Sequence, residues 1–283
     1  MIQQDTARLL ITCHDQPGIV AAVAATLAEQ GANIISLAQH STDAEDGRFF
    51  QRLVLHIEDF AARRADFERG IERLAEKFGM QWSLHNGAQP KRVAIFVSKY
   101  DHCLLDLLWR TQRGELDMEV VCVVSNHPDL EAAVRNFDVP FVHIPSGDKP
   151  AMERAQLDLL AGKVDFIVLA RYMQILSDDF VREVGVPVIN IHHSFLPAFI
   201  GANPYARAKA RGVKLIGATA HYATADLDEG PIIEQDVARV THAENAQDLQ
   251  RRGQDVERMV LARAVQWHCE DRVIVDGAST VIL

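Results

Sequence analysis

Residues 186–197 read VPVINIHHSFLP, an apolar run that ends in a group of polar side chains. A short apolar run of this kind is typical of a buried strand, here with Asn190 and His192 at its carboxyl end. In open α/β sheets, ligands bind in the crevice outside the carboxyl ends of the strands. We therefore predict an α/β fold with a functional site at this strand.

Strand-like and helix-like segments alternate on both sides of this stretch. Before it, apolar runs at 93–97, 120–124, 141–144 and 166–170 are separated by helix-like segments at 103–109, 128–137 and 152–161. This alternation indicates a Rossmann-like, mainly parallel sheet. After it, we predict a helix over 205–211, strands over 215–222 and from 232, a helix over 245–269, and short strands at 272–275 and 280–283.

The first 86 residues have a different order of elements. Strand-like runs at 8–12, 33–40, 48–57 and 81–84 surround a helix from Pro17 to Gly31 and another over 60–78. This βαββαβ order predicts a ferredoxin-like domain. The polar, turn-prone segment 86–90 then marks a boundary between domains 1–86 and 91–283.

Composition restricts the class of protein. A length of 283 residues favours two domains, and a net charge of -10 argues against a nucleic-acid partner. No apolar run reaches the roughly 18 residues of a membrane span, and the first residues lack a signal-peptide pattern. The four cysteines have no CxxC spacing, which argues against a disulfide framework or a structural metal. We expect a cytoplasmic protein with no membrane partner.

The loops that follow the predicted strands carry the candidate site. Asn190, His192, His221 and Asp228 come from two such loops and are expected to converge. A metal site built from these histidines and the aspartate is disfavoured, because adjacent strand residues point to opposite faces. The same alternation turns His193 away from His192 and predicts no role for it. Taken singly, each of these residues could also be purely structural.

Two further loops indicate which classes of ligand the site could bind. The segment 98–102, after the first strand of the second domain, has neither GxGxxG nor GxxxxGK[ST], which argues against a nicotinamide or ATP cofactor. In the loop 171–177, Met173, Ile175 and Leu176 could form a wall for a flat aromatic ligand or could simply cover the core. Ser177 is a plausible N-cap for the helix that follows.

Two sets of motifs resemble known families. The segments 15–20 (DQPGIV) and 31–34 (GANI) resemble an ACT domain. The motif Asn190-Ile191-His192, with Ser194, Leu196-Pro197, His221 and the run 227–233 (LDEGPII), resembles the folate-dependent formyltransferases. The longer runs 192–201 and 217–222, with the ACT-like module in front, make nearly the whole chain similar to the 10-formyltetrahydrofolate deformylases within that superfamily.

The resemblance implies a reaction and a set of residues. It implies hydrolysis of 10-formyltetrahydrofolate in one-carbon metabolism and purine biosynthesis, with no cofactor beyond the folate substrate. Asn190, His192 and Asp228 would be catalytic, and His221 would position Asp228 or a water. Asn190 and His192 can stabilise the oxyanion, and Asp228 can either deprotonate the water or hold His192 charged.

The resemblance also implies contacts with the substrate and with partners. Met173, Ile175 and Leu176 would line the pterin pocket, and Arg171, Lys99 or Arg207 would bind the glutamate tail. Asn203 stands where the deformylase pattern leads us to expect Arg. The ACT-like domain implies an amino-acid effector and a homo-oligomer. The alternatives are a formyltransferase to an amine such as glycinamide ribonucleotide, and a non-catalytic folate or amino-acid sensor.

Overall fold

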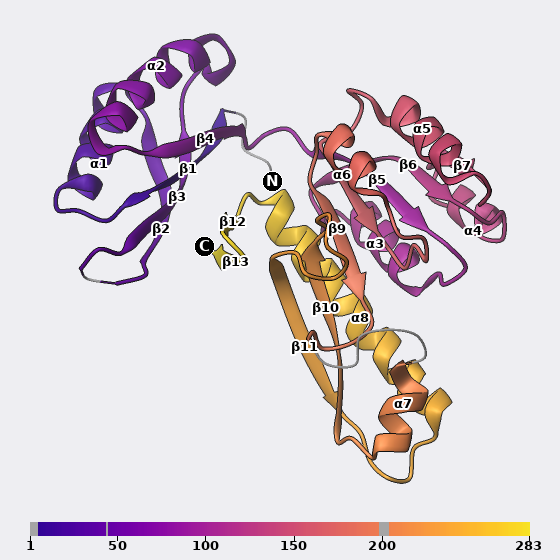
Figure 1. The fold of residues 1–283 in the computed structure, drawn as a ribbon. Helices are drawn as coiled ribbons and strands as arrows, with labels where there is room; N and C mark the ends of the chain where they lie inside the picture. The colour runs from indigo at the N-terminus through magenta and orange to yellow at the C-terminus, as the bar shows by residue number, and fades with distance from the viewer. Residues whose placement is uncertain (1–4, 44, 198–203) are drawn as a thin grey trace. The chain divides into compact units, whose positions relative to one another are not determined.

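The computed structural model describes residues 5–43, 45–197 and 204–283 (Figure 1). The chain divides into two compact units. One consists of Met1–Pro90 with Glu270–Asp276 and Val281–Leu283, and the other of Lys91–Cys269 with Gly277–Thr280.

The first unit contains a four-stranded antiparallel sheet in the order β2-β3-β1-β4. Its apolar core includes Leu9 and Ile11 of β1 together with Phe67 and Ile71 of α2. The predicted βαββαβ order is confirmed. The elements are β1 (Thr6–His14), α1 (Ile19–Glu29), β2 (Asn33–Ser41), β3 (Arg48–His56), α2 (Phe60–Phe78) and β4 (Gln81–Asn86).

The end of the chain forms a short hairpin of β12 (Val273–Asp276) and β13 (Ser279–Ile282). Arg8 on β1 donates to Asp271 at 3.2 Å, and Arg52 on β3 donates to the carbonyl oxygens of Glu270 and Asp271 at 2.6 and 2.9 Å. These contacts group 270–276 with the first unit, whereas the sequence places these residues in the domain 91–283.

The second unit is built on a seven-stranded sheet in the order β11-β10-β9-β8-β5-β6-β7. Strands β5 to β9 pair in parallel, and β10 and β11 are antiparallel to their neighbours. The strands are β5 (Lys91–Val97), β6 (Met118–Ser125), β7 (Phe141–His143), β8 (Phe166–Leu169), β9 (Val188–His192), β10 (Leu215–Tyr222) and β11 (Ile232–Arg239).

Helices cover both faces of this sheet. Phe96 of β5 packs in one cluster with Leu160 of α5 and Phe180 of α6, while Phe166 of β8 lies 4.7 Å from the ring of His268 on α8. The helices are α3 (His102–Gln112), α4 (Glu131–Arg135), α5 (Lys149–Leu160), α6 (Asp178–Val184), α7 (Pro204–Arg211) and α8 (Ala246–Cys269). The predicted mainly parallel α/β fold is therefore confirmed.

The helix predicted over 128–137 is shorter in the structure. α4 covers only Glu131–Arg135, because Glu131 is preceded by a turn closed by the Pro128 carbonyl. At the other end, Phe137 bonds to the carbonyl three residues back and Asp138 takes a left-handed conformation with φ 56°. A helix cannot continue through such a residue.

Strand β5 lies between β8 and β6, so the chain builds the sheet outward from β5 first through β6 and β7 and then, on the other side, through β8 to β11. This switch of direction opens a crevice at the carboxyl ends of β5 and β8. Buried Ser98 joins the two loops there: its N–H donates to the Arg171 carbonyl at 3.3 Å, and its hydroxyl accepts from the Met173 N–H at 3.0 Å. The fold thus fixes where a ligand site can form.

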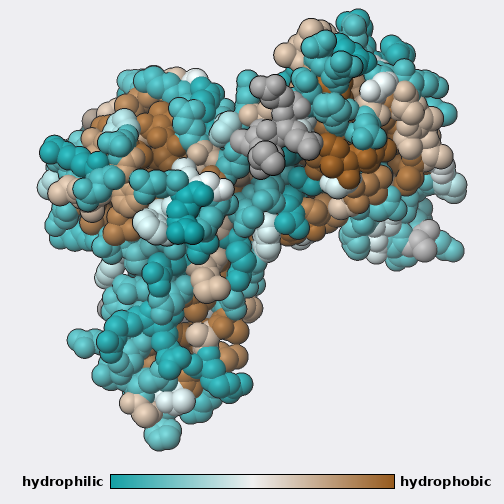
Figure 2. All heavy atoms as spheres, turned by 180° about the vertical axis from the view of Figure 1, so that it is seen from behind, coloured by the Kyte–Doolittle hydropathy of each residue, from teal (hydrophilic) through white to brown (hydrophobic). Residues whose placement is uncertain are grey.

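Hydrophilic residues cover most of the face that Figure 2 shows, with smaller apolar areas between them. Within the described ranges, no helix has the length and apolar character to cross a membrane.

Candidate active site

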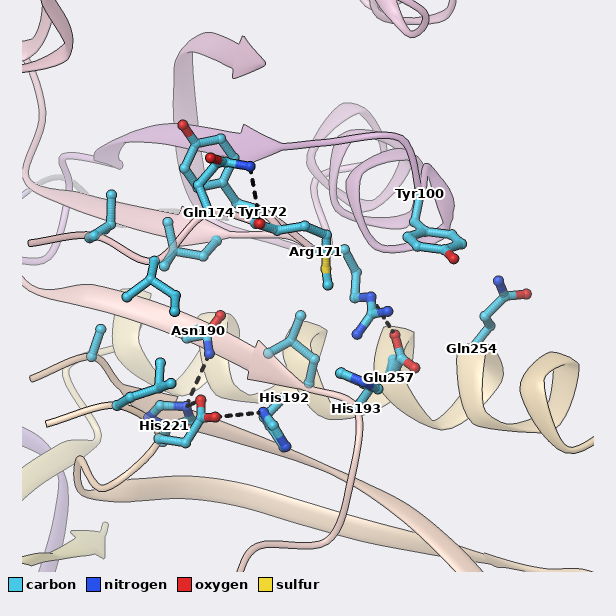
Figure 3. Close-up of a pocket in the computed structure, with 18 of the residues that line it drawn as sticks. Tyr100, Arg171, Tyr172, Gln174, Asn190, His192, His193, His221, Gln254 and Glu257 are labelled. Carbon is cyan, nitrogen blue, oxygen red and sulfur yellow. Dashed lines mark hydrogen bonds and ion pairs between the residues drawn. The ribbon is translucent and has the colours of Figure 1, made fainter. Parts of the chain in front are cut away.

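A cavity of about 630 Å³ opens at the carboxyl ends of β8 and β9 in the second unit (Figure 3). Its walls come from the segment after β5, the loop after β8, β9, α7, the loop after β10 and α8. Asn190, His192, His221 and Asp228 all line it. The structure therefore brings together the four residues that the sequence singles out.

Asn190 and His221 face each other across the antiparallel β9–β10 pair. The Asn190 side-chain nitrogen lies 3.1 Å from Nε2 of His221, and Nδ1 of His221 lies 3.1 Å from the Tyr222 carbonyl oxygen. Because a carbonyl only accepts, Nδ1 of His221 carries the hydrogen and Nε2 accepts from Asn190. The second amide hydrogen of Asn190 is then available to a ligand.

Asp228 holds His192 from the loop after β10. Its Oδ2 lies 3.1 Å from Nδ1 of His192, and its Oδ1 lies 3.5 Å from Nε2 of His221. Burial alone would raise the pKa of the Asp228 carboxyl, but its polar neighbours, with the hydrogen bond from His192 first among them, outweigh burial and hold that pKa well below its usual range. Asp228 is therefore a carboxylate at neutral pH.

The second nitrogen of His192 remains unused by the described part of the chain. His192 is 7% exposed, and its Nε2 is buried without a hydrogen-bond partner among the described residues. A buried polar atom without a partner is costly, and such atoms are typical of ligand and catalytic sites. The Asp228 contact fixes the ring so that this nitrogen can serve a substrate.

His193 lies differently from its predicted position. Strand β9 ends at His192, so the alternation of strand side chains no longer applies one residue later. The rings of His192 and His193 are 5.1 Å apart, and both line the cavity. Burial, followed by the charges of Arg171 and His192, lowers the pKa of His193 to about 4, so its ring is neutral at pH 7.

A buried charge cluster forms another part of the cavity wall. Glu257 on α8 is 1% exposed; its Oε2 lies 2.8 Å from Nε2 of His102 and 3.3 Å from Nε of Arg171. The Tyr205 hydroxyl donates to its Oε1 at 2.6 Å. Burial would raise the pKa of Glu257, but these donors, His102 first, lower it, so the carboxylate stays charged.

None of Glu257, His102 and Tyr205 is among the residues predicted from the sequence. A signal for Glu257 exists, because this acidic residue lies between Gly253 and Leu261 at helical spacing, and both of those residues are buried. An acidic residue on the apolar face of a helix requires a buried partner. The sequence does not show which residue is the buried partner of Glu257.

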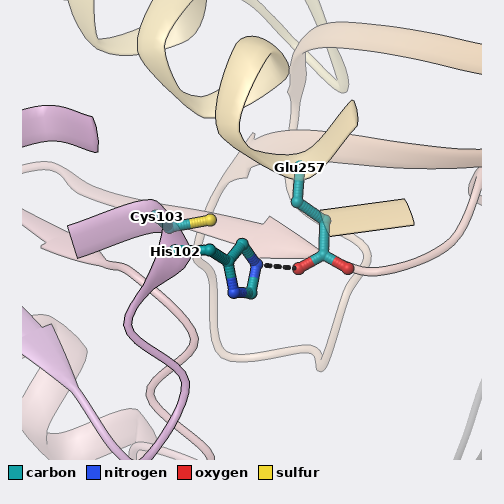
Figure 4. Close-up of side chains that lie close together, drawn as sticks. All are labelled: His102, Cys103 and Glu257. Carbon is teal, nitrogen blue, oxygen red and sulfur yellow. Dashed lines mark hydrogen bonds and ion pairs between the residues drawn. The ribbon is translucent and has the colours of Figure 1, made fainter. Parts of the chain in front are cut away.

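His102, Cys103 and Glu257 also have the spacing of metal ligands (Figure 4), since one ligand atom from each lies within 4.8 Å of the others. Burial raises the pKa of the Cys103 thiol well above its ordinary value, whereas a metal ligand must be a thiolate. Arg171 already compensates the charge of Glu257. The cluster therefore fits a hydrogen-bonded ion pair better than a metal site.

Of the predicted substrate-binding residues, three are apolar and one, Arg171, is charged. Met173, Ile175 and Leu176 line the cavity, with Met173 and Ile175 52% and 62% exposed. Arg171 also lines it, but its guanidinium is paired with Glu257 and lies 5.1 Å from the centre of the Tyr100 ring.

The other two candidate cations for the glutamate tail lie elsewhere. Lys99 and Arg207 are exposed and outside the cavity lining. Asn203, at the position where an Arg is expected, falls outside the described residues.

Comparisons with known proteins agree with the sequence motifs. Residues 91–265 match the formyl transferase family model, and residues 7–69 match the ACT domain model. A formyltetrahydrofolate deformylase from Mycobacterium tuberculosis is 59% identical over 98% of this chain and 91% of its own length. The crystal structure of one from Pseudomonas syringae pv. tomato superposes with a TM-score of 0.93 at 46% identity, covering 98% of this chain and 94% of that one.

The match to transferases is shorter. The glycinamide ribonucleotide transformylase 1 structure from Symbiobacterium toebii has a TM-score of 0.65 and 30% identity, and it covers 69% of this chain and 94% of its own. The deformylases, in contrast, match both units over nearly their full length. This chain belongs to the formyltetrahydrofolate deformylase family.

Proposed function

We propose that this chain hydrolyses 10-formyltetrahydrofolate to formate and tetrahydrofolate, with Asn190, His192 and Asp228 as the catalytic set. The observation that carries the proposal is the Asp228–His192 contact at 3.1 Å, which leaves Nε2 of His192 buried and without a partner among the described residues. Family membership supports the substrate and the hydrolysis.

The two donors on β9 act on the formyl oxygen. When water attacks the formyl carbon, negative charge develops on that oxygen, and preorganised donors in a site with little water lower the barrier. The free amide hydrogen of Asn190 and the Nε2 hydrogen of protonated His192 are these donors. Asp228, as a carboxylate, orients His192 through the 3.1 Å contact and stands as the counter-charge to its protonated ring, and His221 orients Asn190 through a contact of 3.1 Å.

The apolar part of the cavity binds the pterin ring in this proposal. Met173 and Ile175 are large apolar side chains exposed at the cavity, as expected for surfaces that a flat ring would cover. Leu176 lies in the same loop. Arg171 shapes this wall through its pairing with Glu257, and it does not offer a free charge to the glutamate tail.

Incubation of the purified protein with 10-formyltetrahydrofolate and no amine tests the function. Formate and tetrahydrofolate are expected at enzymatic rates. His192→Ala and Asp228→Asn are each expected to lose roughly 10²–10³-fold in kcat, and exposed Asp129→Asn is the matched control. If both variants kept the wild-type rate, the assigned catalytic set would be wrong.

Other outcomes of this assay point to other functions. Release only when an amine such as glycinamide ribonucleotide is added would indicate a transferase, and binding without turnover would indicate a sensor. The proposed mechanism uses only water and side chains of the chain, so dialysis against a chelator is expected to leave the rate unchanged.

For the first unit, we propose an amino-acid effector and assembly into a homo-oligomer. The support is the match of residues 7–69 to the ACT domain model. A cytoplasmic location remains a prediction from the sequence.

A further inference from the structure

We propose that His193 is the general base that takes the proton of the attacking water, which leaves Asp228 to hold His192. The assignment rests on the hydrolysis proposed above and supplies its proton path. The proposal gives His193 a role, whereas the alternation of strand side chains in the sequence predicts none for it.

The position of His193 suits this role. It follows directly after the end of β9, and its ring lies 5.1 Å from that of His192, the proposed donor to the formyl oxygen. On its other side, its ring lies 6.3 Å from that of Tyr205 on α7. Figure 3 shows the two histidines side by side at the cavity. A water held by His193 would therefore stand next to a carbonyl held by His192.

The other titratable groups beside the catalytic residues are already engaged. Asp228 accepts from His192, and His221 uses both ring nitrogens, on Asn190 and on the Tyr222 carbonyl. The carboxylate of Glu257 accepts a hydrogen bond from the Tyr205 hydroxyl at one oxygen and is hydrogen-bonded to Nε2 of His102 at the other.

Asp226, in the same loop as Asp228, is exposed to solvent. The ring of His193, by contrast, has ring contacts but no hydrogen bond to another described side chain. A lone pair on this ring is therefore available to a water.

The surroundings of His193 keep its resting ring neutral and partly compensate a proton gained in the reaction. Burial first, and then the charges of Arg171 in the loop after β8 and His192 on β9, disfavour its protonated form. Glu257 on α8 and Asp228 after β10 favour the protonated form. A proton gained from water would thus be partly compensated by two carboxylates.

In the proposed reaction, the proton taken from water returns to the leaving nitrogen. The water oxygen forms a bond to the formyl carbon, the C=O electron pair moves to the formyl oxygen, and one water proton moves to the His193 imidazole. The tetrahedral intermediate then collapses: the C–N bond to the substrate nitrogen breaks, its electron pair goes to that nitrogen, and the nitrogen takes the proton back from His193. The products are tetrahydrofolate and formic acid, which ionises to formate.

His193→Gln and His193→Ala test the assignment in the full-length protein. General acid–base catalysis contributes roughly 10²–10⁴-fold, so a loss of that size in kcat is expected, with a much smaller change in KM. Added imidazole is expected to restore rate to His193→Ala, and the rescue should increase with pH as imidazole becomes neutral. His143→Gln, at an exposed position on β7, is the matched control.

Several results would overturn the proposal. One is a His193→Gln variant that keeps the wild-type kcat. Another is a loss of activity in His193→Ala that imidazole does not rescue while the acid side of the pH–rate profile stays as in the wild type; His193 would then be structural. If the wild type itself released no formate without an amine, the proposed hydrolysis would fail, and this assignment with it.

Discussion

Two residues of the cavity have backbone conformations that ordinary side chains seldom adopt. Arg171 has φ 64° and Asp228 has φ 59°. A non-glycine residue in this region costs on the order of 1–3 kcal/mol and persists where the surroundings impose it. Asp228 is held by His192, and Arg171 by Glu257. The backbone strain is therefore located at Asp228, which holds His192, and at Arg171, which pairs with Glu257.

The neutral state of His193 gives a prediction for stability. Its pKa is about 4 in the folded chain, against an ordinary 6.5. Between these values the unfolded chain binds more protons than the folded protein, so the free energy of unfolding decreases as pH falls from 6.5 toward 4. One such group contributes up to about 1.4 kcal/mol per pH unit.

Urea denaturation across this pH range, in wild type and His193→Gln, measures the effect. The wild type is expected to lose stability relative to the variant as pH falls, whereas His143→Gln should follow the wild type closely. Parallel curves for wild type and His193→Gln would mean that His193 is protonated as easily in the folded protein as in the unfolded chain.

Helix α8 buries a charged residue, because Glu257 lies in its apolar face. Glu257→Ala would leave the guanidinium of Arg171 without its buried counter-charge. Removing one partner of a buried pair costs about 3–5 kcal/mol, and we expect a loss of this size in the free energy of unfolding.

Urea denaturation of Glu257→Ala at neutral pH tests this expectation. The matched control is Glu115→Ala, whose half-exposed carboxylate pairs with Arg110 and Arg113 and should contribute less than about 1 kcal/mol. Equal stability losses in the two variants would contradict a structural role for the buried cluster.

The periodicity of apolar residues predicts the bounds of a helix or strand well where the residues of that segment alone determine its structure. The helix over 60–78 and the strand over 215–222 have the predicted bounds, and Ser177 caps α6 by accepting from the Phe180 N–H. The grouping of Asn190, His192 and Asp228 follows from motifs at strand ends. The helix, the strand and the cap depend on local spacing, whereas the catalytic grouping also rests on the resemblance to the folate-dependent formyltransferases.

Other features depend on contacts between distant segments, which no local pattern contains. The pairing of Arg171 with Glu257 joins a loop to a helix far along the chain. The position of His193 depends on where β9 stops pairing with β10, and the antiparallel direction of β10 places His221 directly opposite Asn190. At these positions the residue types can be read from the sequence, but the residues that they contact are known only from the folded structure.

In the full-length protein, binding of an amino acid to the first unit is expected to change the activity of the second unit. Adding glycine or methionine to the formate-release assay of the full chain should alter kcat or KM. Sedimentation with and without the same amino acid reports any change in assembly. A flat response to every amino acid would favour a purely structural first unit.

In the proposed reaction, water is the acceptor of the formyl group. The most direct measurement is the reaction of the full-length protein with 10-formyltetrahydrofolate in ¹⁸O-labelled water, with no amine present and with mass analysis of the formate. We predict that the formate carries one ¹⁸O from water and keeps the original formyl oxygen. Formate without the label, or no formate until an amine is added, would show that water is not the acceptor.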